Sequence, residues 1–222
     1  MRVREVHAHG TAGAFITTVT SPGPGDGKSF VCAHLARSFA SSGHRTLLID
    51  GDTRRGHLHK TLGVGRRPGL LDLLSGTATR EQVIRHVPDY GIDLISCGTR
   101  SAGGPELLAS SAMAQLVMSL RADYSVIIVD SPPLGAGVDP LVLAALSGSL
   151  VMVLRTGVTD KDLAESRLGE LQRLPIRILG AVLNDVKPEG MYRYYAYLPG
   201  YRAEDEVSVE VTKPKRRSLL GS

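Results

Sequence analysis

One segment constrains the fold more than any other: a glycine-rich loop that joins a β-branched run to an amphipathic stretch. The run is Phe15 to Thr20, and the stretch from Lys28 to Ser42 carries Val31, Leu35 and Phe39 at helical spacing. The loop between them reads SPGPGDGKS. Glycines let backbone N–H groups approach a phosphate closely, and the positive end of the following helix favours that anion. The sequence therefore predicts a P-loop between a first strand and a first helix.

Each residue type in this loop has a chemical reason to be there. Lys28 supplies a point charge for the β- and γ-phosphates, and the Ser29 hydroxyl is a ligand for Mg²⁺. The predicted nucleotide-binding residues here are Gly23, Pro24, Gly25, Asp26, Gly27, Lys28, Ser29 and Phe30. A dinucleotide-binding loop fails on spacing, because G-x-G-x-x-G begun at Gly23 needs glycine where Lys28 stands.

The rest of the chain alternates short apolar runs with amphipathic stretches. Strands are predicted at 45–50, 92–96, 125–130, 150–155 and 176–183. A helix is predicted over 106–120 behind Pro105, and another begins with a capping box of Thr159 and Asp162. This alternation indicates an α/β fold with a doubly wound, mainly parallel sheet covered by helices on both faces.

Three acids end predicted strands. Asp50 and Asp52 follow the second strand, and Asp130 closes SVIIVD. Because parallel strands end at one edge of the sheet, these acids and the P-loop should share one crevice. Asp130 suits a Walker B acid that holds Mg²⁺ with Ser29 and Asp50. Asp50 and Asp52 could divide metal binding and activation of an attacking hydroxyl.

The composition of the chain argues against several kinds of partner and site. The 222 residues carry a formal net charge of +4, an excess too small and too dispersed for a nucleic-acid partner. The two cysteines, Cys32 and Cys97, show no CxxC pair and no matching histidine spacing, so neither a disulfide framework nor a zinc site is predicted. His57 and His59 resemble a metal pair, but no third ligand follows nearby. The longest apolar run, 141–154, is too short to span a bilayer.

The motifs together resemble the bacterial tyrosine kinases of exopolysaccharide and capsule export. The resemblance rests on LLIDGDTRRGHLHKTLG with GLLDLLSG, on CGTRSAGGPELL, on SVIIVDSPP, on ILGAVLND and on MYRYYAYLPGY, and it covers about residues 15–201. It implies a deviant P-loop fold related to cell-division and chromosome-partition ATPases. The implied activity is ATP- and Mg²⁺-dependent autophosphorylation of tyrosine, with Lys28, Asp50, Asp52 and Asp130 as catalytic residues and Asn184 near the adenine.

The resemblance also implies an organisation and partners. Residues 1–14 would be the remnant of an oligomerisation region, 15–186 the kinase domain and 187–222 a flexible tail. A transmembrane polysaccharide co-polymerase would activate the kinase at the inner face of the plasma membrane, and a cognate tyrosine phosphatase would reverse it. The expected phosphoacceptors, modified between subunits, are Tyr192, Tyr194, Tyr195, Tyr197 and Tyr201. An aromatic strand packed on the sheet is the alternative for these tyrosines.

Several positions depart from the family pattern. Phe30 replaces the threonine of GKST, Gly56 replaces the proline of RRP, and Gly103-Gly104 loosens the PNPxELL loop. The E-x-x-R-x-x-R helix that builds a ring would precede the first strand, where this sequence has MRVREVHAHG. A homo-oligomer is expected, with its ring form left open. Two alternatives remain: an ATPase switch of the partition kind, which would need a lysine where Gly23 stands, and a nucleotide-binding adaptor with lost catalysis.

Overall fold

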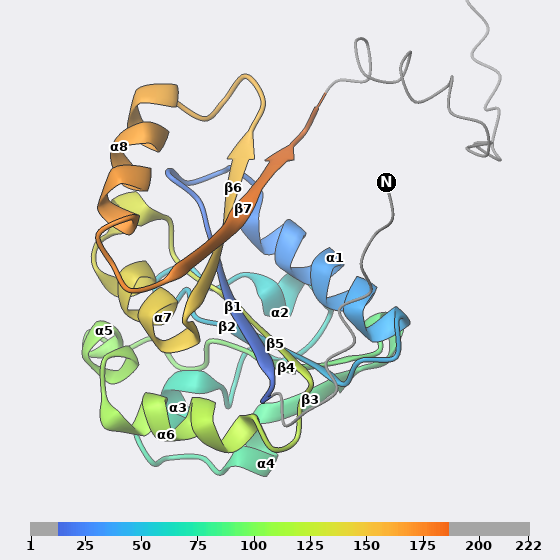
Figure 1. Ribbon diagram of the computed structural model, residues 1–222. Helices are drawn as coiled ribbons and strands as arrows, with labels where there is room; N and C mark the ends of the chain where they lie inside the picture. The colour runs from blue at the N-terminus through green and yellow to red at the C-terminus, as the bar shows by residue number, and fades with distance from the viewer. Residues whose placement is uncertain (1–12, 187–222) are drawn as a thin grey trace, which may run out of the picture. The chain divides into compact units, whose positions relative to one another are not determined.

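The computed structural model describes residues 13–186, which form one sheet with helices on its faces (Figure 1). The strands are β1 (Phe15–Thr20), β2 (Thr46–Asp50), β3 (Ile84–Val87), β4 (Ile92–Ile95), β5 (Val126–Asp130), β6 (Ser149–Arg155) and β7 (Arg177–Asn184). Their order across the sheet is β3-β4-β2-β5-β1-β6-β7. All pairs are parallel except β3 with β4. The predicted doubly wound, mainly parallel sheet is confirmed.

Helices fill the connections between the strands. The α-helices are α1 (Lys28–Ser41), α2 (Leu58–Thr61), α3 (Leu70–Leu74), α4 (Arg80–Val83), α5 (Gly104–Leu108), α6 (Ser111–Leu120), α7 (Asp139–Ser147) and α8 (Lys161–Leu171). Short 3-10 turns lie at Pro88–Tyr90 and Leu134–Ala136. Within residues 13–186, no helix is both long and apolar enough to cross a bilayer.

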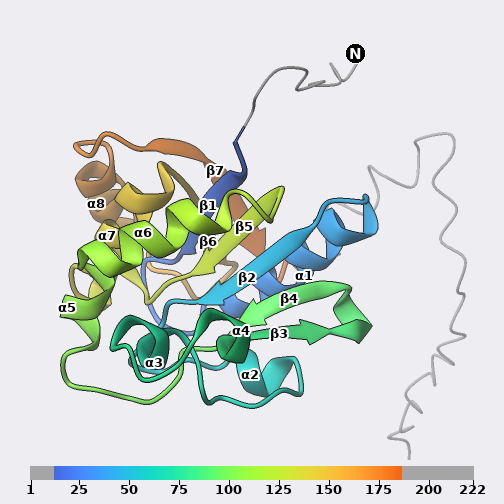
Figure 2. The same cartoon turned by 90° about the horizontal axis from the view of Figure 1, so that it is seen from below.

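The core lies in two layers because the central strands are apolar on both faces. One cluster joins side chains of these strands, such as Leu47 and Ile127, to α3, α5, α6 and α7. The opposite cluster joins Leu48 and Ile128 to α1 and α2. Figures 1 and 2 show α1 on the face opposite to α6 and α7. Because both faces of the central sheet are buried, the polar ends of the strands meet at one edge of the sheet.

Two predicted helix boundaries are wrong, and each has a local cause. The single helix predicted over 106–120 is divided into α5 and α6, because Ser110 is extended and its hydroxyl accepts the backbone N–H of Met113 at 3.4 Å. The capping box of Thr159 and Asp162 does not form. Asp160 caps α8 instead, accepting the N–H of Leu163 at 2.8 Å. Both caps are short polar side chains that compete for helix N-termini.

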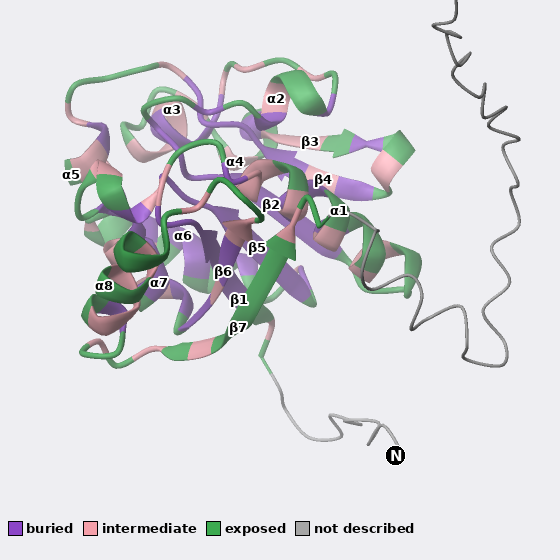
Figure 3. Cartoon of the chain, turned by 90° about the horizontal axis from the view of Figure 1, so that it is seen from above, coloured by how far each residue is buried: buried purple, intermediate pink, exposed green. Residues whose placement is uncertain are grey.

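The helices that cover the sheet do not bury the last strand, β7. Most residues of β7 are exposed, including Leu179, Val182 and Leu183, whereas β1, β2 and β5 are almost wholly buried (Figure 3). Among the described residues, the helical cover of the sheet is therefore incomplete at this edge. The antiparallel β3, which extends the opposite edge, was also not predicted.

Candidate active site

The ends of three adjacent strands bring the predicted residues together. In the order β2-β5-β1, Asp50 is aligned with Asp130, and Asp130 with Val19 next to the P-loop. The register follows from the parallel pairing of three buried apolar strands. It places two strand-terminal carboxylates and the start of α1 at one edge, as the sequence predicts.

Lys28 is the centre of the charge arrangement. Its Nζ lies 3.5 Å from Asp52 Oδ2 and 4.0 Å from Asp130 Oδ1. Burial opposes the ammonium charge, but Asp130 and Asp52 outweigh it and raise the pKa of Lys28. The lysine is therefore held charged between two acids, at the mouth of the loop that is built for phosphate.

The two aligned acids are costly to ionise. Asp50 and Asp130 are completely buried. Burial raises the pKa of Asp130 to about 6, although Lys28 works against the shift. Burial, and then the charges of Asp130 and Asp52, raises the pKa of Asp50 well above its usual range. Asp52 and Asp130 share Lys28, and Asp50 adds a third carboxylate beside them, so these acids outnumber the lysine.

This excess of acids fits a divalent cation. Both carboxylate oxygens of Asp130 and Oδ1 of Asp50 are buried and have no hydrogen-bond partner among the described residues. Oxygen donors of this kind are the ligands that Mg²⁺ prefers. Ser29, at the start of α1, adds a hydroxyl that lowers the pKa of Asp130. Asp50 and Asp130 are aligned across β2 and β5, and Ser29 lies in the first turn of α1, while their joint role as metal ligands stays a prediction.

Other loop residues shape the P-loop instead of facing its ligand. Asp26 is buried, and its carboxylate accepts the N–H of Gly23 at 3.2 Å and the hydroxyl of Thr159 at 2.7 Å. Gly27 has a φ of 88°, and a Cβ there would overlap the amide of Asn184. That amide donates to the carbonyl of Asp26 at 3.0 Å. Asn184 thus lies against the P-loop at the end of β7, and its proposed contact with adenine stays a prediction.

A cleft of about 650 Å³ opens beside the loop, a volume typical of small-molecule sites. Phe30 lines it with 56% of its surface exposed, and its ring lies 4.2 Å from that of His34. The predicted residues along its wall are Gly23, Pro24, Gly25, Gly27, Lys28, Ser29, Phe30 and Asp52. A flat aromatic surface therefore stands at the position where the family pattern has a hydroxyl.

Sequence reasoning missed three polar side chains at this site. Thr159 braces Asp26, Arg155 Nη1 donates to the carbonyl of Gly25 at 3.2 Å, and Arg54 lines the cleft while pairing with buried Asp139 at 3.1 Å. Arg54 could have been found from its place in the DGDTR motif. Thr159 and Arg155 lie more than a hundred positions from the loop, and only the sheet order brings them to it.

The predicted phosphoacceptors are five tyrosines late in the chain. Tyr192, Tyr194, Tyr195, Tyr197 and Tyr201 lie outside the described residues 13–186. Their modification stays a prediction.

Known sequences resemble this chain over different parts of its length. A profile of the CobQ/CobB/MinD/ParA nucleotide-binding domain matches residues 17–197. The putative tyrosine-protein kinase EpsB of Ralstonia solanacearum is 49% identical over 87 residues, which are 39% of this chain and 12% of that protein. The tyrosine-protein kinase ptk of Acinetobacter johnsonii is 44% identical over 92 residues, 41% of this chain and 13% of that protein. The matched stretches are thus about an eighth of these relatives' length.

Solved structures agree over more of the chain. The kinase domain of the Escherichia coli tyrosine kinase ETK has a TM-score of 0.74 and 33% identity, covering 77% of this chain and 67% of that one. The VpsO kinase domain has a TM-score of 0.74 and 32% identity, covering 78% and 86%. The septum site-determining protein MinD of Pyrococcus horikoshii, complexed with Mg-ADP, has a TM-score of 0.66 at 23% identity, a likeness of fold alone.

Proposed function

The chain belongs to the CobQ/CobB/MinD/ParA nucleotide-binding family and, within it, to the kinase domains of bacterial tyrosine kinases, and on that premise we propose that it transfers the γ-phosphoryl group of ATP to tyrosine. The single observation that carries the proposal is Lys28 Nζ, held 3.5 Å from Asp52 and 4.0 Å from Asp130 beside the P-loop. This arrangement can neutralise phosphate charge on one side and accept a proton on the other.

We assign each residue of the site one role in phosphoryl transfer. The backbone of the P-loop binds the phosphates of ATP, and Lys28 neutralises the charge that develops during transfer. Ser29, Asp130 and Asp50 would hold Mg²⁺, which supplies Lewis-acid neutralisation of the phosphate oxygens. Asp52 accepts the phenol proton as the tyrosine oxygen attacks phosphorus and the bond to the β-phosphate oxygen breaks. The Arg55 N–H donates to Asp52 Oδ1 at 2.9 Å and orients this carboxylate.

The substrate and the cellular setting are proposed from the resemblance to the family. We propose that the phosphoacceptors are the five tyrosines at 192, 194, 195, 197 and 201 of a neighbouring copy. A transmembrane chain-length regulator would activate the kinase on the cytoplasmic side of the membrane, and a tyrosine phosphatase would reset it. The process served would be exopolysaccharide or capsule export, as the resemblance implies.

The test is phosphorylation of the purified 222-residue chain by ATP and Mg²⁺, read by mass-spectrometric mapping of phosphotyrosine. In Lys28→Met we expect phosphotransfer to fall by at least about 10²–10³-fold, the cost of removing one preorganised charge donor. Lys60→Met is the matched control, because Lys60 is exposed on α2 and should retain the wild-type rate.

The outcome that contradicts the proposal is a wild-type chain that binds ATP but stays unmodified when the regulator is present. That result would support the nucleotide-binding adaptor instead. Modification at equal rates in wild type and Lys28→Met would contradict the role assigned to Lys28.

A further inference from the structure

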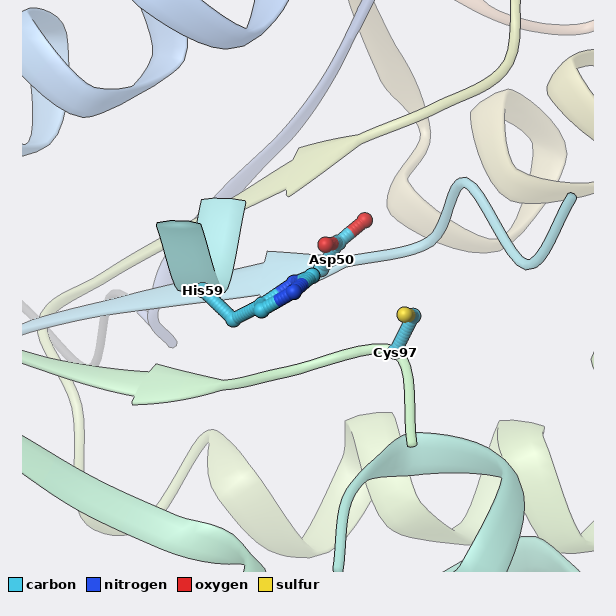
Figure 4. A group of neighbouring side chains, drawn as sticks. All are labelled: Asp50, His59 and Cys97. Atoms are coloured by element: carbon cyan, nitrogen blue, oxygen red, sulfur yellow. The ribbon is translucent and has the colours of Figure 1, made fainter. Parts of the chain in front are cut away.

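Asp50 has a second set of neighbours besides Asp52 and Asp130. His59 lies on α2 and Cys97 in the loop after β4, and one ligand atom from each of the three side chains lies within 4.8 Å of the other two. Figure 4 shows the three side chains gathered from these separate segments. Asp50 and Cys97 are completely buried, while His59 is half-buried and gives the group a path to solvent.

Two of the three side chains have buried polar atoms with nothing to bind. Asp50 Oδ1 and His59 Nδ1 lack a hydrogen-bond partner among residues 13–186. Among the described residues, the Cys97 thiol donates to the carbonyl of its neighbour Gly98 at 3.9 Å. A buried polar atom without a partner costs about 1–3 kcal/mol, so such atoms are rare in folded proteins. Two of the three clustered side chains thus carry an unpartnered buried atom, which indicates a ligand between them.

The chemistry of the donors selects the ligand. A thiolate, a neutral imidazole and a carboxylate are the donors that bind Zn²⁺, whereas Mg²⁺ takes oxygen ligands. We propose that Asp50, His59 and Cys97 form a binding site for a transition-metal cation of the Zn²⁺ class. Three protein ligands leave the fourth tetrahedral position to water. On binding, the S–H bond of Cys97 breaks, a sulfur–metal bond forms and the proton passes to solvent.

The surrounding backbone makes room for this thiol. Gly56 has a φ of 30°, and a Cβ there would overlap Cys97 Sγ. Proline, which the family pattern has at this position, cannot adopt a positive φ. Glycine at 56 therefore lets Cys97 approach His59 and Asp50 instead of merely loosening the loop.

Burial favours the uncharged forms of the two titratable donors. Burial and then Arg66 lower the pKa of His59, the direction that favours the neutral imidazole. Burial and then the charge of Asp50 raise the pKa of the Cys97 thiol to about 11, and Arg66 opposes this shift. Arg66 is held in place because its Nε donates to the carbonyl of Gly98 at 2.9 Å.

The experiment is a titration of the full chain with Co²⁺, in excess Mg²⁺ that occupies the sites built from oxygen ligands. We expect the sulfur-to-cobalt charge-transfer absorption, and its loss when Zn²⁺ displaces Co²⁺. Cys97→Ser should abolish the band. His59→Ala should weaken Co²⁺ binding by about 100-fold or more, because loss of a mere outer-shell partner already costs about 10–100-fold.

Two matched controls keep the result specific. The chain has two cysteines, and Cys32, which is buried near Asp130, is the other candidate for a thiolate band. Cys32→Ser should retain the band, and so should His57→Ala, because His57 is exposed and outside the group.

Absence of the band in wild type, or its survival in Cys97→Ser, would overturn the proposal. Loss of the band in Cys32→Ser alone would move the site to the P-loop and also overturn it. If Cys97→Ser fails to fold, His59→Ala decides, since it leaves both thiols in place. None of these outcomes depends on phosphotransfer, which is measured separately in Mg²⁺ alone.

Discussion

Asp50 has two groups of neighbours, and the two groups suit different kinds of cation. The P-loop side is made of Asp52 and Asp130, and the second side of His59 and Cys97. On the P-loop side, Asp52 and Asp130 lie 3.5 and 4.0 Å from the Lys28 ammonium, and the unpartnered donors are the two carboxylate oxygens of Asp130. On the other side the neighbours are an imidazole and a thiol. One buried carboxylate therefore separates a site for a hard cation from a site for a softer one. A cation on the second side would draw on an acid that the proposed kinase needs.

The largest effect expected from this contrast is inhibition of phosphotransfer by Zn²⁺ at saturating Mg²⁺ and ATP. Zinc bound to His59 and Cys97 would hold the Asp50 carboxylate on their side. In Cys97→Ser, the Zn²⁺ concentration that halves the rate should rise by about 100-fold. The measurement is the rate of tyrosine phosphorylation against buffered free Zn²⁺.

Cys32→Ser is the control for general thiol effects, and its Zn²⁺ dependence should match that of wild type. Equal inhibition of wild type and Cys97→Ser would place the inhibitory ion at the magnesium ligands. This prediction rests on the proposed kinase activity, whereas Co²⁺ binding does not.

A smaller effect is expected from the packing of the second side. A Cβ at residue 56 would overlap Cys97 Sγ and lie 2.9 Å from the carbonyl of Asp52, so Gly56→Ala should lower the free energy of unfolding by about 2–3 kcal/mol. Removing the sulfur in Gly56→Ala/Cys97→Ala should show a coupling of about 1 kcal/mol. Urea unfolding followed by circular dichroism measures both.

Gly63 is the matched control for backbone strain. It has a φ of 66°, but a Cβ at this position would meet no atom within 4 Å, so Gly63→Ala should cost only the strain of about 1 kcal/mol. Equal losses at the two glycines, with no coupling to Cys97, would show that the close approach at Gly56 is unimportant.

The contrast also shows what sequence can and cannot predict. Lys28, Asp50 and Asp130 follow from short motifs, because a parallel sheet brings strand ends together whatever lies between them. The group of Asp50, His59 and Cys97 does not follow from spacing. Its position depends on how α2 and the loop after β4 fold against β2, and metal-binding spacing rules describe only ligands that lie close along the chain.

The fold likewise has parts that the sequence predicts and parts that it does not. The buried strands and the P-loop helix can be predicted from the sequence, because their apolar runs are long and their boundaries are glycines or acids. The division into α5 and α6 was missed because Pro105 reads as a helix start, whereas the cap that matters is Ser110. The antiparallel β3 carries Arg85 and His86 between apolar ends and has no strong strand signal of its own.

The smallest expected effect concerns pH on the P-loop side. Burial raises the pKa of Asp130 to about 6, above its value in the unfolded chain, and raises that of Asp50 in the same direction. The contribution of Asp130 to stability without metal is therefore complete below about pH 4 and is lost as the pH rises through about 6. The ionised acids are the form that binds a cation. Affinity for Mg²⁺ and a non-hydrolysable ATP analogue should thus increase by about tenfold from pH 5 to pH 7, as a titration monitored by calorimetry would measure. Asp130→Asn should flatten this dependence, and an unchanged slope in that variant would mean that Asp130 does not ionise in this range.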